Sequence, residues 1–172
     1  MGTPKGAPGP YAVTEPDELE KNPILQSLRA TTPGAIIEAL TFRGEMTLVV
    51  SPVHLRRVAE LLQAEPGMQF NFLSDITAVD RFPLHPRFEL NYQLLSLGLR
   101  QALRLRVALT DSKNPQIESM TPVWPTANWL EREIFDLFGI RFLGHPDLRR
   151  IVMPDSWEGY PLRKDFPVEG FR

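Results

Sequence analysis

The chain has 172 residues, of which 42% are hydrophobic, and this size and composition predict one compact domain with tails. Its 19 basic and 21 acidic residues nearly balance, which argues against nucleic acid or an anionic membrane as a partner. The absence of cysteine excludes disulfides, a thiol nucleophile, thiolate zinc sites and cysteine-ligated iron-sulfur clusters.

Residues 1–23 are predicted to form a disordered leader. Proline, glycine and charged residues outweigh apolar ones there, and no periodicity emerges before Ile24. The N-terminus lacks the order of charged, apolar and small residues that marks a signal peptide. No apolar run approaches the roughly 20 residues that cross a bilayer. We therefore expect the chain to stay in the cytosolic compartment.

A β-hairpin is predicted next, because the apolar runs IIEALTF and MTLVV flank a turn at Arg43-Gly44-Glu45. Ser51 and Pro52 then suit the N-cap and the first position of a helix. The residues that recur at helical spacing in it are Leu55, Val58, Ala59 and Leu62. Pro66-Gly67 ends this helix.

Three further strands are predicted, over FNFLSDITAVD, residues 88–94 and residues 103–107. The last two alternate apolar and polar side chains, so one face should pack on helices and the other should contact water. The order strand, strand, helix, three strands, helix lacks the regular alternation of a doubly wound fold. We predict an α+β domain over residues 24–140, a two-layer sandwich of a mostly antiparallel sheet with helices on one face.

A helix of about three turns is predicted within WLEREIFDLFGIRFLGHPDLRR, residues 129–150. Asn128 and Glu131 have the spacing of a capping box, and Gly139 stands where a left-handed C-terminal residue belongs. The apolar arc of this helix consists of Leu130, Ile134, Leu137 and Phe138. The polar arc around Trp129 consists of Arg132, Glu133 and Asp136.

The polar arc has three interpretations. It could be a solvated helix face with an intrahelical Arg132–Asp136 ion pair at i,i+4 spacing. It could hold Glu133 and Asp136 as an acid/base pair, although nothing nearby supplies a nucleophile, a phosphate-binding glycine loop or a second histidine. It could also be a charged surface paired across a subunit interface, with Trp129 and Phe135 as aromatic contacts.

The histidines predict no metal site. His54 and His85 are far apart, without ligand spacing to any acid, and we expect each to be structural or exposed. His145 is followed by Asp147, but one histidine and one aspartate are fewer than the three protein ligands of a catalytic zinc.

Residues 141–172 are rich in apolar side chains, yet they show no sustained helical or strand period and contain many prolines and glycines. The basic doublets Arg149-Arg150 and Arg163-Lys164 lie between the apolar residues. This pattern predicts an extended C-terminal arm, which either folds back over its own sheet or lies on another protein.

Residues 131–170 carry a long set of motifs: in order, Glu-Arg-Glu at 131–133, Asp136, FGI at 138–140, GHPDLRR at 144–150 and PLRKDFP at 161–167. Together they closely resemble the signature of the C subunit of NADH-quinone oxidoreductase, the family of the 30 kDa-type subunit of respiratory complex I. Tyr160 stands where the family often has a histidine, so no histidine chemistry is expected at that position.

The resemblance implies a structural and assembly subunit without a cofactor, in the hydrophilic arm of a proton-translocating NADH:quinone oxidoreductase. FMN and iron-sulfur clusters would lie on partner subunits, and quinone would be met only indirectly. The chain would pack chiefly on the quinone-site D subunit, and also near the B subunit, at the cytoplasmic face of a bacterial inner membrane. Its partner interface would consist of Trp129, Glu131, Arg132, Glu133, Asp136, His145, Asp147, Arg149, Arg150, Trp157, Arg163, Lys164, Asp165 and Phe166.

Two alternatives stay open. The chain could be the equivalent subunit of a membrane-bound energy-converting hydrogenase or of a photosynthetic NDH complex. It could also be a stand-alone enzyme that uses Glu133, Asp136 and His145 for acid/base chemistry.

Overall fold

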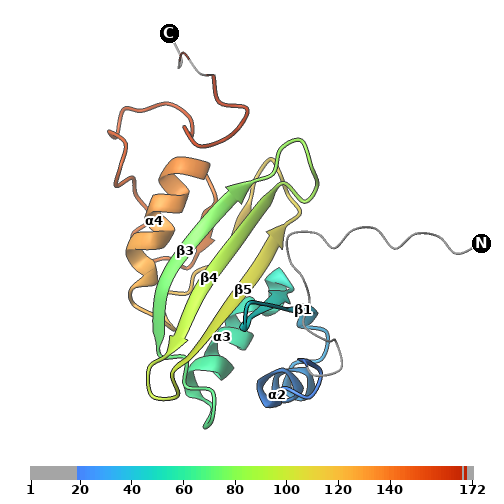
Figure 1. Cartoon of the computed structure of the whole chain (residues 1–172). Helices are drawn as coiled ribbons and strands as arrows, with labels where there is room; N and C mark the ends of the chain where they lie inside the picture. Colours follow the sequence, from blue (N-terminus) through green and yellow to red (C-terminus); the bar gives the residue numbers. More distant parts are fainter. Residues whose placement is uncertain (1–18, 168, 170–172) are drawn as a thin grey trace, which may run out of the picture.

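A five-stranded sheet is the framework of the chain, in a computed structural model that describes residues 19–167 and 169 (Figure 1). The strands lie in the order β1-β2-β5-β4-β3, and every neighbouring pair is antiparallel except β2 and β5. Their bounds are β1 Ile36–Phe42, β2 Glu45–Val50, β3 Phe72–Asp80, β4 Phe88–Ser96 and β5 Gln101–Leu109. The predicted hairpin, the three later strands and the mostly antiparallel sheet are confirmed.

The two central strands separate a helix-covered face from an open one. In β4 and β5 every second side chain is buried, and the residues between them are partly exposed. The buried side chains include Leu90, Tyr92, Leu94, Leu105 and Val107. Burial of one face of a strand follows from its two-residue period, so the alternation in the sequence correctly predicted a sheet with helices on one face.

Two helices from the first half of the chain cover this sheet. Helix α3 (Leu55–Ala64) turns Leu55, Val58, Ala59 and Leu62 into the core, as predicted. Its entry differs from the prediction, because Pro52–His54 forms a separate 3-10 turn, η1, and the Ser51 side chain makes no capping hydrogen bond. Helix α2 (Pro23–Thr31) was not predicted; the Asn22 side chain caps it by accepting from two backbone N–H groups.

The predicted leader lies mostly outside the described residues, which begin at Leu19. The side chain of Leu19 is buried against the core, and Pro23 is the first residue of α2.

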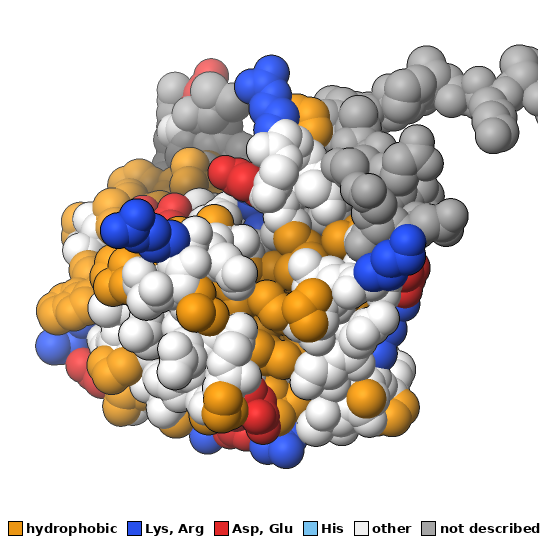
Figure 2. Space-filling model, turned by 60° about the horizontal axis from the view of Figure 1, so that its bottom comes forward, with side chains coloured by type: hydrophobic (Ala, Val, Ile, Leu, Met, Phe, Trp, Pro, Cys, Tyr) orange, Lys and Arg blue, Asp and Glu red, His pale blue; other side chains and the backbone are white. Residues whose placement is uncertain are grey.

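Figure 2 looks at the end of the molecule that lies lowest in Figure 1, and there hydrophobic side chains are gathered between polar ones.

Helix α4 (Ala127–Phe138) lies beside β3, at the edge of the sheet (Figure 1). Trp124, just before it, donates its indole N–H to the Phe70 carbonyl at 2.9 Å and so fixes the entry to the helix. The predicted capping box is wrong. The N-cap residue is Thr126, and the Glu131 carboxylate turns away from the helix start to accept hydrogen bonds from Ser119 and Met120.

The chain after α4 first adds a small second sheet and then returns along the helix. Strand β7 (Arg141–Leu143), at the start of the predicted arm, pairs in parallel with β6 (Gln116–Glu118). Residues 144–167, called here the C-terminal segment, contain no helix or strand. Figure 1 shows this segment looping back over α4. The predicted arm thus begins with a strand, its described remainder is irregular, and its contact with a partner stays a prediction. No helix in the described part of the chain is both long and apolar enough to cross a membrane.

Gly139 is required at the end of α4 for two reasons. Its φ of 70° is left-handed, as the sequence predicted, and the ring of Tyr160 from the C-terminal segment packs directly on its Cα. A Cβ built at Gly139 would overlap three atoms of that ring. Gly144 has a similar φ of 78°, but a Cβ there would meet none of the described atoms within 4 Å.

We expect Gly139→Ala to lower the free energy of unfolding by roughly 3 kcal/mol, because left-handed strain and displacement of Tyr160 add. Gly144→Ala introduces only the left-handed backbone strain and should lower the free energy of unfolding by about 1 kcal/mol. Urea denaturation of both variants measures the difference. Equal losses would show that the Tyr160 contact contributes nothing.

Candidate functional site

Asp136 binds the C-terminal segment to helix α4. Its side chain is fully buried, and its Oδ2 accepts three backbone N–H groups, from Ile151 at 2.9 Å, Val152 at 2.7 Å and Met153 at 2.9 Å. Its Oδ1 accepts from the Arg150 guanidinium. Burial raises the pKa of Asp136, but the three amides and Arg150 outweigh it and hold that pKa below its ordinary value. The carboxylate is therefore a charged receptor for the returning backbone.

Two arginines, Arg132 and Arg150, also bind the C-terminal segment to α4 near residues 149–153. Arg150 also donates to the carbonyls of Asp136 and Gly159, at 3.1 and 3.0 Å. Arg132 donates to the carbonyls of Arg149 and Arg150, both at 3.2 Å, and its guanidinium lies 5.0 Å from the centroid of the Trp129 ring.

The predicted Arg132–Asp136 ion pair is therefore wrong, and of the predicted solvated face only Trp129 and Glu133 are exposed. The Arg132 and Asp136 side chains are both buried, and each binds the C-terminal segment rather than the other. The segment offers three N–H donors to the carboxylate and two carbonyls to the guanidinium, and these partners outcompete an i,i+4 pair worth only a few tenths of a kcal/mol.

A second cluster binds the far end of the C-terminal segment to the sheet. Arg87 donates two hydrogen bonds to Asp80, at 2.9 and 2.7 Å, and two to Asp165, at 2.8 and 2.6 Å. The second oxygen of Asp80 also accepts the Lys164 backbone N–H at 2.9 Å. Burial raises the pKa of Asp80, but Arg87 and two backbone amides bring that pKa down to about 2. The carboxylates of Asp80 and Asp165 and the guanidinium of Arg87 therefore stay ionised near neutral pH.

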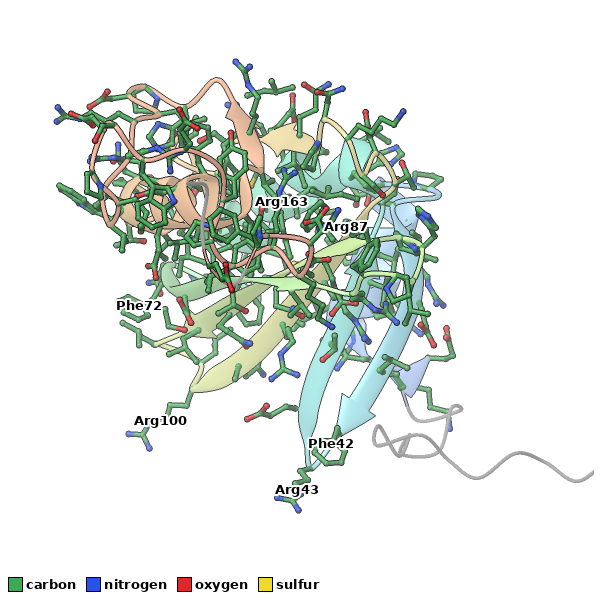
Figure 3. All side chains as sticks on the ribbon, turned by 90° about the horizontal axis from the view of Figure 1, so that it is seen from above. Phe42, Arg43, Phe72, Arg87, Arg100 and Arg163 are labelled. Atoms are coloured by element: carbon green, nitrogen blue, oxygen red, sulfur yellow. The ribbon has the colours of Figure 1, made fainter. Side chains whose placement is uncertain are left out.

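Arg163 adds a contact between this cluster and α4. It donates to the Phe138 carbonyl at 2.6 Å, and its guanidinium lies over the rings of Tyr160 and Phe88, at 4.8 and 5.3 Å. Arg87 lies over the same Phe88 ring at 4.8 Å. Figure 3 shows Arg87 and Arg163 entering one region between the sheet and the C-terminal segment.

Glu131 is a buried carboxyl on the inner side of α4. It accepts from Ser119 Oγ and from the Met120 N–H, both at 2.6 Å. Burial raises its pKa, and these two hydrogen bonds offset that only in part, so the pKa rises from its ordinary value of 4.5 to about 7. The group fixes α4 to the end of β6 and does not reach the protein surface.

The His145 ring also has an internal role. Its Nδ1 accepts the Asp147 N–H at 3.0 Å, so Nε2 carries the proton and donates to the Asn128 carbonyl at 3.1 Å. Asp147 pairs with Arg149 at 2.9 Å on the exposed surface. Among the described residues, no group of three histidine or acidic side chains could hold a metal ion.

The acid/base trio of the stand-alone enzyme does not form a catalytic group. Glu133 is exposed, whereas Asp136 is buried, ionised and fully engaged with the segment. Both ring nitrogens of His145 are occupied by backbone groups. A general acid must hold a transferable proton near neutral pH, and Asp136 does not.

Several large apolar side chains of the C-terminal segment and of α4 are exposed, among charged ones. The exposed fractions are 62% for Trp129, 56% for Val152 and 51% for Leu162. These three residues, together with exposed Leu143 at the end of β7, Ile151 and Trp157, are called here the apolar outer face; Trp157 is stacked on Phe166. Exposed Glu133, Asp147, Arg149, Lys164 and Asp165 are the other predicted interface residues that reach the surface, and their contact with a partner stays a prediction.

Sequence reasoning missed Asp80, Arg87 and Ser119. The local signal for the first two was weak: an acid at the end of a strand and an arginine just before the next strand, across the loop RFPLHPR. Nothing local connects them to Asp165, which lies 78 positions after Arg87.

Residues 48–172 match the family model described as "Respiratory-chain NADH dehydrogenase, 30 Kd subunit". The NADH-quinone oxidoreductase C subunit of Roseiflexus sp. (strain RS-1) is 45% identical over 150 residues, which cover 87% of this chain and 86% of that protein. The NADH-quinone oxidoreductase C 2 subunit of Rhizobium etli (strain CIAT 652) is 46% identical over 155 residues, covering 90% of this chain and 79% of that protein.

Two solved structures resemble the fold. "Nqo5 of the trypsin-resistant fragment (1-134)" has a TM-score of 0.62 and 35% identity, and covers 73% of this chain and 96% of its own. A chain of the membrane-bound sulfane sulfur reductase, an archaeal respiratory membrane complex, has a TM-score of 0.72 and covers 84% of both chains. At 24% identity, this second likeness concerns the fold alone.

We expect Asp136→Asn to release the C-terminal segment, because the three N–H groups and Arg150 lose their charged acceptor. Breaking a buried ion pair of this kind costs roughly 3 kcal/mol, so amide exchange at residues 151–153 should accelerate about hundredfold. Hydrogen exchange followed by NMR measures this. Asp147→Asn removes an exposed Asp–Arg pair in the same segment and is the control, for which exchange should not change. Unchanged protection in Asp136→Asn would contradict the assigned role.

The raised pKa of Glu131 predicts that stability falls as pH rises from about 4.5 to 7. In this window the folded chain keeps a proton that the unfolded chain has released, so rising pH favours unfolding, by about 3 kcal/mol in total from this group. Glu131→Gln should remove that slope in urea titrations at pH 4.5 to 7.5. Glu133→Gln, an exposed change on the same helix, should leave it intact. A slope that persists in Glu131→Gln would assign it to other groups.

Proposed function

Because the chain belongs to the family of the 30 kDa subunit of respiratory-chain NADH dehydrogenase, we propose that it is a structural and assembly subunit of a proton-translocating NADH:quinone oxidoreductase. In this proposal it lies in the peripheral arm of the complex, packed chiefly against the quinone-site D subunit and near the B subunit. The chain would lie peripherally, at the cytoplasmic face of a bacterial inner membrane.

The proposal is carried by a contrast within α4 and the C-terminal segment, where buried charged side chains bind the chain itself and large apolar side chains are exposed. The charged residues Asp136, Arg132 and Arg150 are used within the chain, where they fix the path of the segment. The same path leaves Trp129, Val152 and Leu162 more than half exposed. Apolar and aromatic side chains held in place in this way suit the centre of a protein interface.

We propose that FMN and iron-sulfur clusters belong to partner subunits and that this chain meets quinone only indirectly. The sequence offers no thiolate ligand for a cluster. The contacts of Glu131, Asp136 and His145 are those of side chains that hold backbone in place. Their role in the complex is then to shape a surface, and electron transfer takes place elsewhere.

The alternative complexes have less support. Relatives at 45% and 46% identity are named subunits of NADH-quinone oxidoreductase. The chain from the sulfane sulfur reductase complex shares the fold at 24% identity, which does not extend to its reaction.

We expect Val152→Asp to reduce the amount of assembled complex about tenfold or more, because a buried interface would have to accommodate an unpaired carboxylate. Complexes that do assemble should keep their NADH:quinone activity per FMN. Val53→Asp is the matched control, since Val53 is 79% exposed in η1, away from the apolar outer face. Native gels of membranes give the amount of complex, and FMN content normalises the activity.

Two outcomes would contradict the assembly role. A normal amount of complex with collapsed activity per FMN would give Val152 a part in turnover. Equal loss of complex in Val152→Asp and Val53→Asp would show that any added surface charge disturbs assembly. Circular dichroism of both purified variants verifies that each still folds.

A further inference from the structure

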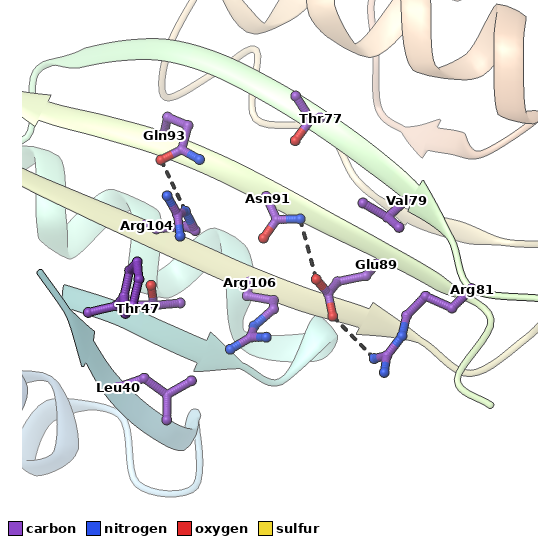
Figure 4. Close-up of a pocket in the computed structure, with 11 residues that line it drawn as sticks. Leu40, Thr47, Thr77, Val79, Arg81, Glu89, Asn91, Gln93, Arg104 and Arg106 are labelled. Carbon is purple, nitrogen blue, oxygen red and sulfur yellow. Dashed lines mark hydrogen bonds and ion pairs between the residues drawn. The ribbon is translucent and has the colours of Figure 1, made fainter. Parts of the chain in front are cut away.

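The face of the sheet opposite the helices forms a trough of about 390 Å³ (Figure 4). All five strands contribute to it, and β5 runs along its middle, between the edge strands β1 and β3. Its lining residues do not belong to the C-terminal segment or to the apolar outer face. Any ligand of the trough is therefore separate from the contact proposed above.

The floor of the trough carries two arginines on its central strand. Arg104 and Arg106 are alternate residues of β5, so both point into the trough, as Figure 4 shows. One row of paired residues crosses the strands in the order Leu40, Thr47, Arg104, Gln93 and Asp75. The next row has the order Glu38, Val49, Arg106, Asn91 and Thr77.

The charge of the trough is consequently positive along its middle. Amide side chains, Gln93 and Asn91, flank the arginines on the β4 side, and a hydroxyl and an aliphatic side chain flank them on the β2 side. The acids of the two rows lie on the edge strands β1 and β3. Glu89, which also lines the trough, bonds to Arg81 and Asn91 at one end of it.

Arg104 is held by weak contacts that a partner could replace. Its Nε donates to the Gln93 side-chain oxygen at 3.3 Å, and its guanidinium lies 3.5 Å from Glu45, which is largely exposed. An exposed pair of this kind contributes little. A carboxylate offered from above would form a bidentate pair with guanidinium, which is stronger and more directional.

We propose that the trough receives a helix from a neighbouring subunit, with two carboxylates one turn apart facing Arg104 and Arg106. Alternate residues of a strand are about 7 Å apart, and helical residues at i and i+4 are about 6 Å apart along the axis. Five strands span about 19 Å, which accommodates a helix about 10 Å wide. Leu40 and Phe42 on one side and Val79 on the other give the flanks of that helix apolar contacts.

This inference rests on the proposed function, because the neighbouring subunit is taken to belong to the same complex. It adds a second contact on the opposite layer of the fold. The C-terminal segment and α4 would face one partner surface, and the open face of the sheet would bind an acidic helix.

Photo-cross-linking in the native complex tests the occupant. The photoreactive residue benzoylphenylalanine is placed at Thr77, which lines the trough, and at exposed Val53 as a control. After illumination of purified complex, mass spectrometry identifies the attached peptides. The expected product from Thr77 is a peptide of another subunit with two acidic residues three or four positions apart.

A charge-reversal pair supplies the second readout. Arg104→Glu/Arg106→Glu should reduce the Thr77 cross-link roughly tenfold, since each lost pair becomes a repulsion. Arg56→Glu/Arg57→Glu makes the same charge change on α3, whose arginines pair only with Glu60 in the structure described, and should leave the cross-link unchanged. Circular dichroism verifies the fold of both double variants.

The results separate this inference from the proposed function. If the chain co-purifies with the complex but Thr77 cross-links no more than Val53, the trough is unoccupied and the inference fails alone. A cross-linked peptide from this chain, or one without paired acids, also overturns it. If the unsubstituted chain is absent from the purified complex, the proposed function fails.

Discussion

The three backbone N–H groups that converge on Asp136 fix the course of the C-terminal segment beside α4. Residues 144–167 have no regular secondary structure, so their amides find few partners within the segment itself. One buried carboxylate supplies acceptors for three of them and pairs with Arg150 as well. Without this charge these three amides would have to be solvated, and Ile151 and Val152 of the apolar outer face would lose their main support.

Because the C-terminal segment returns along it, helix α4 contacts other parts of the chain on several of its sides. Ile134 packs into the core, Glu131 binds the end of β6, and Asp136 and Arg132 bind the returning segment. A stretch that looks like an amphipathic surface helix is thus enclosed on most sides by its own chain. Its buried acids and arginines hold other parts of the chain in place, so the charged motif of this helix encodes internal contacts of the fold.

The sheet could be predicted from the sequence, whereas the site could be predicted only in part. Alternation in β4 and β5 is a local signal and fixed both strands and their buried faces. Helix α2 has nine residues and follows a stretch rich in proline, so its one local signal, Asn22 before Pro23, was too little. Local spacing rules also gave a capping box for Glu131 and an ion pair for Asp136, and both failed because distant backbone groups were better partners. Arg87 and Asp165 meet across 78 positions, which no local pattern encodes.

The single parallel pairing in the sheet, between β2 and β5, sets an order on folding. The β1–β2 hairpin and α3 leave the ribosome well before β5, and β3 and β4 come between them. Until β5 arrives, β2 has an unpaired edge and Leu48 and Val50 lack the strand that completes their side of the core. A nascent chain shorter than about 110 residues therefore exposes an apolar strand edge of the kind that aggregates. The N-terminal half of this protein depends on its middle before any partner is involved.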